Sequence, residues 1–480
     1  MNLPTLREVV AAPGAAVTAE IRGLERSIAV ADVLSASFIR GDAASLQGRS
    51  VALATDGQLA TAVGLLELDG VARRMVLCTP DLAGADFAAV MAAAGTDVVL
   101  VDEPAGTSRA GAARAAADHD RSVAGLEYRQ IGSEAAPSGA RDFVSRSTEW
   151  VLLTSGTTAV PKLVAHDLQS LAGRLPHRDA HGDRIVWSTF YDIRRYGGLQ
   201  IFLRAMTCGA VLVLSDARET IGDFLARAGA QGVTHISGTP SHWRRALMSG
   251  AIDRLRPRYV RLSGEVADQS LLDALRSAFP SARIAHAFAS TEAGVAFDVE
   301  DGLAGFPAAY VHGGAAERPG GVELAVIDGT LRIRSARNAA CYLGAAPPLA
   351  GADGFVDTGD LVELTGGRYQ FRGRRGGVIN VGGQKVYPEE VEAALNADAR
   401  VKMSLVRARR NPITGAVVVA DVVLAGEGAR GCDPEVERLL IEDLRAGLRR
   451  TLPAHKVPAV IRVVATLEVS AGGKLVRPGG

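Results

Sequence analysis

Short apolar runs alternate with segments of helical spacing early in the chain. Apolar runs at 51–55, 74–78 and 97–101 are separated by helix-like segments at 58–70 and 84–95. This rhythm predicts strand, helix, strand, helix. Because the runs lack polar alternation, the strands are expected to be covered on both faces, as in a parallel sheet between two layers of helices.

The same rhythm returns after a polar stretch at 132–149. The further predicted strands are 150–153, 210–214, 233–237, 259–262 and 283–288, and the further predicted helices are 219–230, 240–248 and 268–278. Residues 1–50 are weakly patterned, and no element is predicted there. The pattern therefore indicates an α/β protein with layered, mostly parallel sheets.

The pattern changes near residue 305. Alternating apolar residues at 321–333, arranged around Asp328-Gly329, predict an antiparallel hairpin and hence a small β subdomain. Segment 371–380 contains three arginines and three glycines and offers little apolar surface, so we expect a domain boundary there.

The remainder predicts a smaller α+β unit. The predicted elements are helices at 388–396 and 434–451 and strands at 401–408, 416–424 and 459–465. The glycine-rich tail, 470–480, is expected to be mobile. We therefore predict a large N-terminal domain at 1–373 and a mobile C-terminal domain at 374–480.

Composition excludes several classes of partner. The 480 residues include 53 Lys and Arg and 53 Asp and Glu. Such a balance argues against nucleic acid, because a phosphate backbone binds clustered, uncompensated positive charge. The 4 cysteines lie far apart, without a CxxC pair, so no disulfide framework or zinc site is indicated. No apolar stretch reaches the roughly 18 residues of a membrane helix, and the amino terminus does not resemble a signal peptide. We expect a cytoplasmic protein without membrane insertion.

One loop has the composition of a phosphate-binding site. Thr154, Ser155, Gly156, Thr157 and Thr158 follow the strand at 150–153 and precede Pro161-Lys162. Hydroxyls can donate hydrogen bonds to phosphate, glycine lets backbone N–H groups approach it, and the lysine adds positive charge. On composition alone an ordinary turn is the favoured interpretation of this segment. The loop is not a Walker A motif, because GxxxxGK[ST] is absent.

Five motifs in order resemble the signature of the adenylate-forming superfamily, which includes acyl-CoA synthetases, nonribosomal-peptide adenylation domains and luciferases. The motifs are TSGTTAVPKLVAH (154–166), AFASTE (287–292), Thr358-Gly359-Asp360, FRGRRGGVINVGGQKVYPEEVE (371–392), and Gly473-Lys474 with Arg477 after LPAHKVP (452–458). Together they span most of the chain. The order and spacing of five motifs make this resemblance specific.

The resemblance implies an enzyme that uses ATP and Mg²⁺ to convert a carboxylic acid into an acyl-adenylate with release of pyrophosphate. It implies that the loop at 154–158 and Lys162 bind the pyrophosphate end, that Thr291 contacts the α-phosphate, and that Glu292 ligates Mg²⁺. It also implies that Lys474 bridges the carboxylate and the α-phosphate, although on its position alone it could be a solvated lysine near a terminus. The nucleotide site would further include Gly264, Glu265, Phe288, Ala289, Asp360 and Arg374.

The acid-binding pocket is less well defined by sequence. Phe190, Tyr191, Asp192, His235 and Gly238 are its predicted rim, together with Ser237, Thr239 and Gly264. In amino-acid-activating relatives an Asp near this position binds the substrate amine, so Asp192 could have that role. Two alternatives stay open: Asp192 could pair with Arg194 or Arg195, and His235 could be a satisfied core histidine.

Three positions depart from the family pattern. Ala159 and Ala289 stand where the family commonly has glycine, and each adds one methyl group beside the nucleotide. Gly376 stands where the hinge usually carries Asp or Lys, and glycine widens the accessible backbone conformations there.

The leading interpretation is an AMP-forming acid–thiol ligase of the acyl-CoA synthetase type, with a small carboxylic acid and coenzyme A as partners. The alternative is adenylation of an amino or aryl acid, or of an unusual oxyanion, with transfer to the phosphopantetheine of an acyl carrier protein or to an amine in secondary metabolism. A catalytically inactive nucleotide- or acyl-binding protein is a third possibility. The sequence indicates neither the acid nor the oligomeric state.

Overall fold

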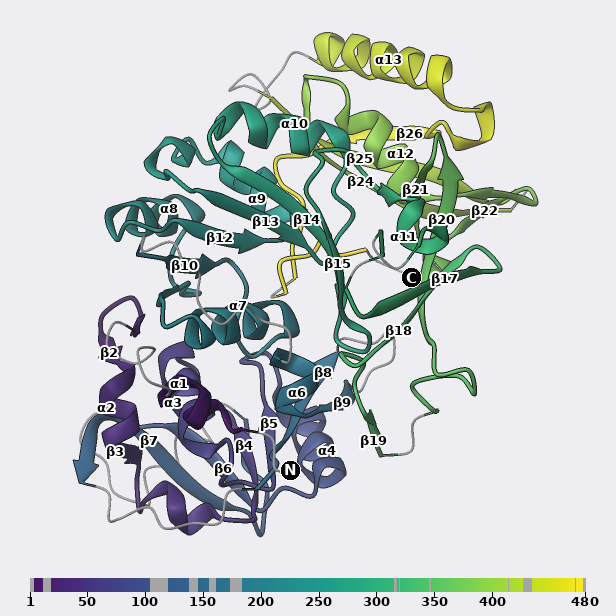
Figure 1. Ribbon diagram of the computed structural model, residues 1–480. Helices are drawn as coiled ribbons and strands as arrows, with labels where there is room; N and C mark the ends of the chain where they lie inside the picture. Colours follow the sequence, from purple (N-terminus) through teal and green to yellow (C-terminus); the bar gives the residue numbers. More distant parts are fainter. Residues whose placement is uncertain are drawn as a thin grey trace.

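Two large sheets, a smaller antiparallel sheet and a carboxyl-terminal unit make up the protein (Figure 1). The computed structural model describes residues 4–11, 19–103, 120–137, 146–154, 161–172, 184–314, 317–318, 320–344, 347–412, 414–425, 434–470 and 472–477. The predicted α/β class is confirmed.

The first predicted block forms an eight-stranded sheet in the order β19-β9-β8-β5-β4-β6-β7-β3. Its parallel strands are β4 (Ser50–Leu53), β5 (Arg74–Leu77), β6 (Val98–Asp102), β7 (Glu127–Pro137) and β8 (Glu149–Thr154). Antiparallel strands β3 (Ala36–Ile39), β9 (Lys162–His166) and β19 (Cys341–Leu343) complete it. Helices α3 (Gln58–Leu68) and α4 (Gly84–Ala94) confirm the predicted alternation.

The second block forms another eight-stranded sheet, in the order β15-β14-β13-β12-β10-β11-β1-β2. Its strands include β10 (Val186–Thr189), β11 (Val211–Leu214), β12 (His235–Gly238), β13 (Tyr259–Ser263), β14 (Arg283–Ser290) and β15 (Gly294–Val299). Helices α8 (Ile221–Ala230), α9 (Pro240–Met248) and α10 (Gln269–Ala278) share a hydrophobic cluster with one face of this sheet. All the predicted strands and helices of this block are present.

Several elements were not predicted from the sequence. Helix α7 (Tyr196–Thr207) is buried along most of its length, so its apolar residues do not form the single stripe that identifies an amphipathic helix. The weakly patterned amino terminus contains α1 (Leu6–Ala11), β1 (Glu20–Arg22), β2 (Ser27–Ala29) and α2 (Val30–Ser35). These elements are too short to establish a period.

The predicted hairpin lies in a five-stranded antiparallel sheet. The order is β16-β21-β20-β18-β17, with β16 (Phe306–Pro307), β17 (Val322–Ile327), β18 (Thr330–Ser335), β20 (Val356–Thr365) and β21 (Arg368–Arg374). Asp328 and Gly329 form the turn, with φ of 52° and 73°, as a two-residue hairpin loop requires.

The carboxyl-terminal unit also has the predicted elements. It contains β22 (Ile379–Val381), β23 (Gln384–Val386), α12 (Pro388–Asn396), β24 (Val401–Asn411), β25 (Gly415–Leu424), α13 (Pro434–Thr451) and β26 (Val460–Val463) around its own hydrophobic cluster. The domain boundary at 373/374 stays a prediction; it coincides with the end of β21.

Two expectations about this half can be set beside observed contacts. Segment 371–380 was expected to offer little apolar surface, and within it Phe371 stacks on Phe288 with ring centroids 5.5 Å apart. The mobility of the tail stays a prediction; in the structure Leu475 and Arg477 donate hydrogen bonds to Glu265 and Glu392. The conformation of Gly376 is not special to glycine: its φ is not positive, and a Cβ there would meet no atom within 4 Å.

Two negative expectations can be checked within the described parts of the chain. None of the helices there is both long and apolar enough to cross a membrane. Of the cysteines that the structure describes, Cys78, Cys208 and Cys341, none forms a disulfide.

Candidate active site

The predicted site residues converge where β12, β13 and β14 end and the carboxyl-terminal segment arrives (Figure 1). Gly238 ends β12, Gly264 follows β13, and Phe288 lies near the end of β14. In open parallel sheets, loops at the carboxyl ends of the strands form the ligand-binding crevice. The topology therefore brings together residues that are far apart in the sequence.

A tight loop presents Lys474 to this edge of the sheet. Within the loop, Ser470 N–H donates to Lys474 O and Gly473 N–H donates to Ser470 O, both at 2.8 Å. Two contacts fix the loop to the large domain: Thr239 Oγ1 donates to Gly473 O, and Leu475 N–H donates to Glu265 Oε1 at 3.0 Å. The lysine is therefore held in place at the large domain.

Lys474 lies near both positively and negatively charged side chains. A Cβ placed on Gly264 would lie 3.9 Å from Lys474 Nζ, so the ammonium lies directly beside that glycine. Solvent still reaches the Lys474 side chain. Its pKa is nevertheless lowered, first by partial desolvation and then by the positive charge of Arg374. The nearby carboxylates of Glu265, Asp360 and Glu292 oppose this shift. The lysine thus shares one electrostatic environment with three of the predicted site residues.

Asp360 and Arg374 face each other across the β20–β21 ladder. They are paired residues in that ladder, and Arg374 Nε lies 3.3 Å from Asp360 Oδ1. Burial raises the pKa of Asp360, opposed by Arg374 and then Lys474. Gly359 has a φ of 71°, which favours glycine, at the irregularity of β20 where its pairing with β18 shifts register. The structure therefore brings together two residues that were predicted to belong to the nucleotide site.

Thr291 and Glu292 are fixed by backbone contacts. His166 Nε2 lies 2.7 Å from Thr291 O, and Ala339 N–H donates to Glu292 O at 2.9 Å. Tyr342 OH donates to Glu292 Oε1 at 3.3 Å. His166 was not among the predicted site residues, although it ends the first of the five motifs.

Lys162 begins β9, opposite Thr154 in the β8–β9 ladder. Its Nζ lies 5.2 Å from the centroid of the Tyr342 ring, a cation–π contact. Burial, followed by the Glu292 carboxylate, raises the pKa of Tyr342 to about 12. Through Tyr342, Lys162 lies on the same side of the site as Glu292. Four predicted loop residues, Ser155, Gly156, Thr157 and Thr158, and also Ala159, lie outside the described residues.

Phe288 and Ala289 occupy an irregular part of the sheet. The β14–β15 ladder shifts its register between these two residues. Phe288 stacks on Phe371 with ring planes 5° apart and also lies against Phe297, at 5.9 Å. Phe288 is therefore supported from the small antiparallel sheet, and its predicted contact with the nucleotide stays a prediction.

Glu265 has contacts that the sequence did not indicate. Its carboxylate accepts hydrogen bonds from Ser241 N–H at 2.9 Å and Ser241 Oγ at 3.0 Å, in addition to the one from Leu475. It therefore joins the start of α9 to the Lys474 loop. The predicted place of Glu265 in the nucleotide site stays a prediction.

Aromatic side chains line the predicted acid-binding rim. Phe190 stacks on His242, with centroids 5.3 Å apart, and a Cβ on Gly238 would lie 2.7 Å from Phe190 Cδ2. Tyr191 OH donates to Ser263 O at 2.6 Å. Phe190, Tyr191 and Gly238 thus lie together as predicted, with little free space between Phe190 and Gly238.

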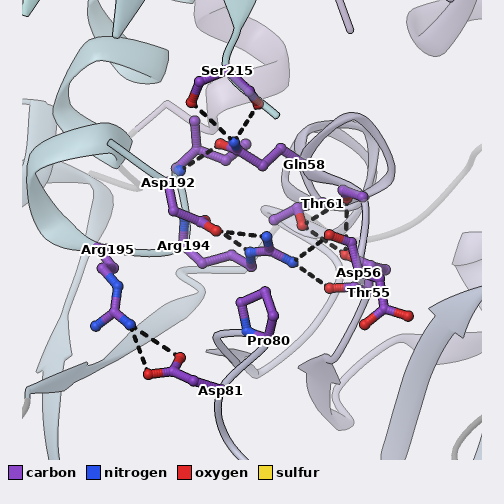
Figure 2. A network of polar contacts seen from close by, with 12 residues as sticks. Thr55, Asp56, Gln58, Thr61, Pro80, Asp81, Asp192, Arg194, Arg195 and Ser215 are labelled. Atoms are coloured by element: carbon purple, nitrogen blue, oxygen red, sulfur yellow. Dashed lines mark hydrogen bonds and ion pairs between the residues drawn. The ribbon is translucent and has the colours of Figure 1, made fainter. Parts of the chain in front are cut away.

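Asp192 is occupied by an internal ion pair. Its two carboxylate oxygens accept from Arg194 Nε at 2.8 Å and Nη2 at 2.6 Å. Figure 2 shows that Arg194 also reaches the backbone oxygens of Thr55 and Asp56, which lie in the first sheet domain. Of the two interpretations of Asp192, the structure has the internal pair, which ties the two large sheets together.

We expect Asp192→Asn to act on stability. Arg194 is 2% exposed, so the substitution leaves its charge buried beside a neutral amide; breaking a buried pair typically costs about 3–5 kcal/mol. Chemical denaturation should show a loss of several kcal/mol, whereas Asp216→Asn, in a pair with the exposed Arg218, should cost less than about 1 kcal/mol. A raised KM for the acid at unchanged stability would instead assign Asp192 to the substrate.

His235 is not part of the rim. It begins β12, at the opposite end of the strand from Gly238. Its ring lies 4.8 Å from the ring of Trp187 and 5.7 Å from that of Tyr259, and its Nδ1 lies 2.9 Å from Thr234 Oγ1. The half-buried ring is therefore engaged by its neighbours, as in the alternative of a satisfied structural histidine.

The Lys474 loop requires glycine at residue 473. Gly473 has a φ of 74°, and a Cβ there would lie 1.8 Å from Cε1 of His242. The His242 ring cannot easily move, because its Nδ1 accepts from Thr239 N–H and it stacks on Phe190. Burial lowers the pKa of His242 to about 3, so the ring stays neutral and keeps that acceptor.

We expect Gly473→Ala to displace Lys474 and to reduce adenylate formation about tenfold or more, since strain and overpacking together cost roughly 1–3 kcal/mol. Gly472→Ala is the matched control: a Cβ at 472 meets its nearest neighbours at 3.7 Å, and its φ is not positive. Equal rates for the two variants in a pyrophosphate-release assay would show that the contact with His242 is unimportant.

No cluster of three metal-ligating side chains exists within the described ranges. A Mg²⁺ ion bound with ATP does not need one, because Mg²⁺ commonly takes one or two carboxylates and fills its shell with phosphate oxygens and water. Glu292 is a single carboxylate with one oxygen bonded to Tyr342. The residues present thus fit a magnesium–nucleotide complex.

Comparison with known proteins agrees with this geometry. The family model "AMP-binding enzyme" matches residues 46–339, and "AMP-binding enzyme C-terminal domain" matches residues 390–474. An isonitrile lipopeptide synthase of Streptomyces coeruleorubidus is 28% identical over 68% of this chain, which spans only 23% of that synthase. A 2-succinylbenzoate–CoA ligase of Salmonella typhimurium is 28% identical over 53% of each chain.

Among solved structures, that of the anthranilate CoA ligase AuaEII in complex with anthranoyl-AMP is similar in fold. The TM-score is 0.77 at 18% sequence identity, over 98% of this chain and 96% of the ligase. The fold, the site and the family match over more than half of the sequence agree with the resemblance of the five motifs. The chain belongs to the AMP-binding enzyme family, within the adenylate-forming superfamily.

Proposed function

We propose that this protein activates a carboxylic acid with ATP to an acyl-adenylate and transfers the acyl group to the thiol of coenzyme A. The position of Lys474 carries this proposal: its ammonium lies beside Gly264 and in the field of Asp360 and Glu292. The two reactants, a carboxylate and a triphosphate, are both anions. A fixed cation between them offsets their repulsion and orients them.

In the first step a carboxylate oxygen attacks the α-phosphorus of ATP, and the bond from that phosphorus to the bridging oxygen breaks. Pyrophosphate leaves with the electron pair, so no proton transfer is required. In this proposal Thr291 contacts the α-phosphate, and Lys162, together with the loop at 154–158, binds the pyrophosphate. Asp360 can accept hydrogen bonds from both ribose hydroxyls, with Arg374 beside it.

Magnesium supplies charge neutralisation to the phosphates when it is bound, and Glu292 is the side chain that would hold it. Tyr342 orients the Glu292 carboxylate through its hydroxyl. Lys162 is close to the same tyrosine ring. Three side chains from three different strands or loops therefore act on one end of the triphosphate.

In the second step the thiol sulfur attacks the acyl carbon and AMP leaves. We infer that residues 374–480 rotate as a unit between the steps, because the Lys474 loop has no role in the second reaction. Few contacts hold this loop to the large domain, chiefly those to Thr239 and Glu265. Gly376, which has open space around its Cα, is a suitable pivot.

A carrier-protein thiol is the second candidate acceptor. The similarity to the isonitrile lipopeptide synthase, which extends over 68% of this chain, supports this candidate. Transfer to an amine is the third. Each of these acceptors follows the same adenylation step, so the choice among them does not affect the first reaction.

The test measures pyrophosphate release and then acyl transfer. Purified protein is incubated with ATP, Mg²⁺ and each member of a panel of aliphatic, aromatic and amino acids, and the active acids are then offered coenzyme A, phosphopantetheinylated carrier protein or an amine. The proposal predicts acid-dependent pyrophosphate release and a coenzyme A thioester. ATP binding without release for any acid would favour a non-catalytic protein, and transfer only to a carrier or an amine would replace coenzyme A as the acceptor.

A further inference from the structure

Polar contacts join the large domain to the carboxyl-terminal unit at a second place, besides the Lys474 loop. Here α9 packs against β24 and α10 against α12 (Figure 1). Arg244, on α9, donates from Nη1 to Lys402 O at 3.1 Å and from Nη2 to Asp268. Asp268 Oδ2 also accepts from Asn396 Nδ2 at 3.2 Å. These contacts form a latch of four residues: Arg244 and Asp268 on the large domain, and Asn396 and Lys402 on the unit.

A β-bulge presents the carbonyl that Arg244 binds. The β24–β25 ladder shifts its register between Val401 and Met403, so Lys402 is the extra residue on its strand. A bulge takes the extra residue out of the regular pairing and bends the strand locally. The Lys402 carbonyl faces α9 from this position and accepts from Arg244.

The contact between Asp268 and Asn396 is fixed from both sides. Asp268 is the N-cap residue of α10, and its Oδ1 accepts from Leu271 N–H at 3.0 Å and from Ser270 Oγ at 2.7 Å. Asn396 Oδ1 accepts from Ser404 Oγ at 2.9 Å. Because a carboxylate can only accept, the amide nitrogen of Asn396 must face Asp268. Each side chain is therefore oriented by its own domain before the two meet.

On the large domain, one helix carries both the latch and the contact to the Lys474 loop. Thr239, the N-cap of α9, donates to Gly473 O. Arg244 follows between one and two turns further along the same helix. The Lys474 loop and the bulge of β24 are therefore both docked against α9, and a rotation that carries Lys402 away from α9 carries the Lys474 loop away as well.

On the carboxyl-terminal unit, one helix likewise carries both. Arg477, which follows the Lys474 loop, donates from its two Nη atoms to the two carboxylate oxygens of Glu392 on α12, at 2.8 Å each. Asn396 lies four residues further along α12, about one turn, and so on the same side of the helix. The latch and the lysine loop are thus tied to each other within both domains.

The latch is shielded from solvent. The side chains of Arg244 and Asp268 are 13% and 15% exposed. Hydrogen bonds that involve an ionised group are stronger than those between neutral groups, and here a guanidinium donates to a carbonyl and a carboxylate accepts from an amide. Both bonds cross between the domains, so they stabilise this orientation of the unit over any in which it has rotated away.

Resting on the proposed two-step reaction, we propose that Arg244 is a positioning residue for adenylation, which, together with Asp268, holds the carboxyl-terminal unit where Lys474 reaches the site. The latch acts on the equilibrium between the two orientations of the unit. Adenylation follows the population of the first orientation, and acyl transfer follows the population of the second. The ratio of the two rates therefore follows the equilibrium constant, whatever its value in the wild-type protein.

The test measures both half-reactions of Arg244→Met in single turnovers, using an acid that supports pyrophosphate release, its synthetic acyl-adenylate and the thiol acceptor. Loss of a hydrogen bond from a charged donor should lower the ratio of the adenylation rate to the acyl-transfer rate about 10- to 100-fold. Arg244→Lys keeps a positive charge beside Asp268 and should recover part of the ratio. Arg245→Met, at the neighbouring exposed arginine of α9, is the matched control and should keep the wild-type ratio.

Asn396→Ala tests the latch from the other domain. It removes the donor to Asp268, while Ser404 Oγ keeps the Glu392 carbonyl as an acceptor. Its ratio should also fall, which keeps the inference testable if the melting temperature shows that Arg244→Met does not fold. An unchanged ratio in the folded variants, including equal losses in both half-reactions, would overturn the inference and leave the two-step reaction intact. Absence of pyrophosphate release from the wild-type protein with every acid would remove the proposed function and this inference with it.

Discussion

Replacing Lys474 by alanine should abolish adenylate formation while leaving the thiol reaction of a preformed adenylate nearly unchanged. Its ammonium is the positive group that the tail brings to Gly264, within the field of Asp360 and Glu292. Losing a preorganised charge at the reacting centre typically costs about 10²–10³-fold in rate. Pyrophosphate release in single-turnover experiments measures the first step, and thioester formation from synthetic acyl-adenylate measures the second.

Lys385→Ala is the matched control, since Lys385 is an exposed lysine of the same carboxyl-terminal unit. This variant should keep the wild-type rate of pyrophosphate release. If Lys474→Ala also releases pyrophosphate at the wild-type rate, Lys474 does not act on the first step. If both half-reactions fall equally, the lysine supports the fold and not the chemistry.

Glu265→Ala should have the second largest effect. Its carboxylate holds the start of α9 through Ser241 and the Lys474 loop through Leu475. Hydrogen bonds to a charged group contribute about 1.5–3 kcal/mol each, so loss of the one to Leu475 should slow adenylate formation roughly 10- to 100-fold. The half-reaction with thiol should fall much less, because the loop contact is needed only in the first step.

Two comparisons separate this role from a general loss of stability. Glu25→Ala removes an exposed glutamate that is paired with Arg218, and it should leave both half-reactions unchanged. Glu265→Gln retains one acceptor oxygen and should recover part of the rate. Equal losses in both half-reactions for Glu265→Ala would contradict its assignment as the anchor of the Lys474 loop.

Much of the fold can be predicted from the local pattern of apolar and polar residues. The helix at 434–451 has the predicted bounds, and the Asp328-Gly329 turn forms the expected hairpin, because both depend on residues that are close in sequence. By contrast, α7 was missed because burial on nearly all sides removes its polar face. The short amino-terminal strands were missed because they gain their stability from neighbours such as β11, far along the chain.

The site residues that lie in the five motifs could be predicted from the sequence. Asp360, Arg374, Glu292 and Lys474 are brought together as the motifs imply. Asp192 and His235 depended on side-chain partners, Arg194 and Trp187, which pattern alone does not select. The anchoring contact of Glu265 joins positions 210 residues apart. Such a contact follows from tertiary geometry and leaves no local signal.

Attack of a carboxylate oxygen on the α-phosphorus of ATP can be followed by one isotope measurement. An acid that supports pyrophosphate exchange is labelled with ¹⁸O in both carboxylate oxygens, converted to its thioester, and the released AMP is analysed by mass spectrometry. Attack at the α-phosphorus should give AMP that carries one ¹⁸O atom, because one carboxylate oxygen stays on the phosphorus when the thiol takes the acyl group. Unlabelled AMP, or label in orthophosphate, would show that the carboxylate does not attack this phosphorus.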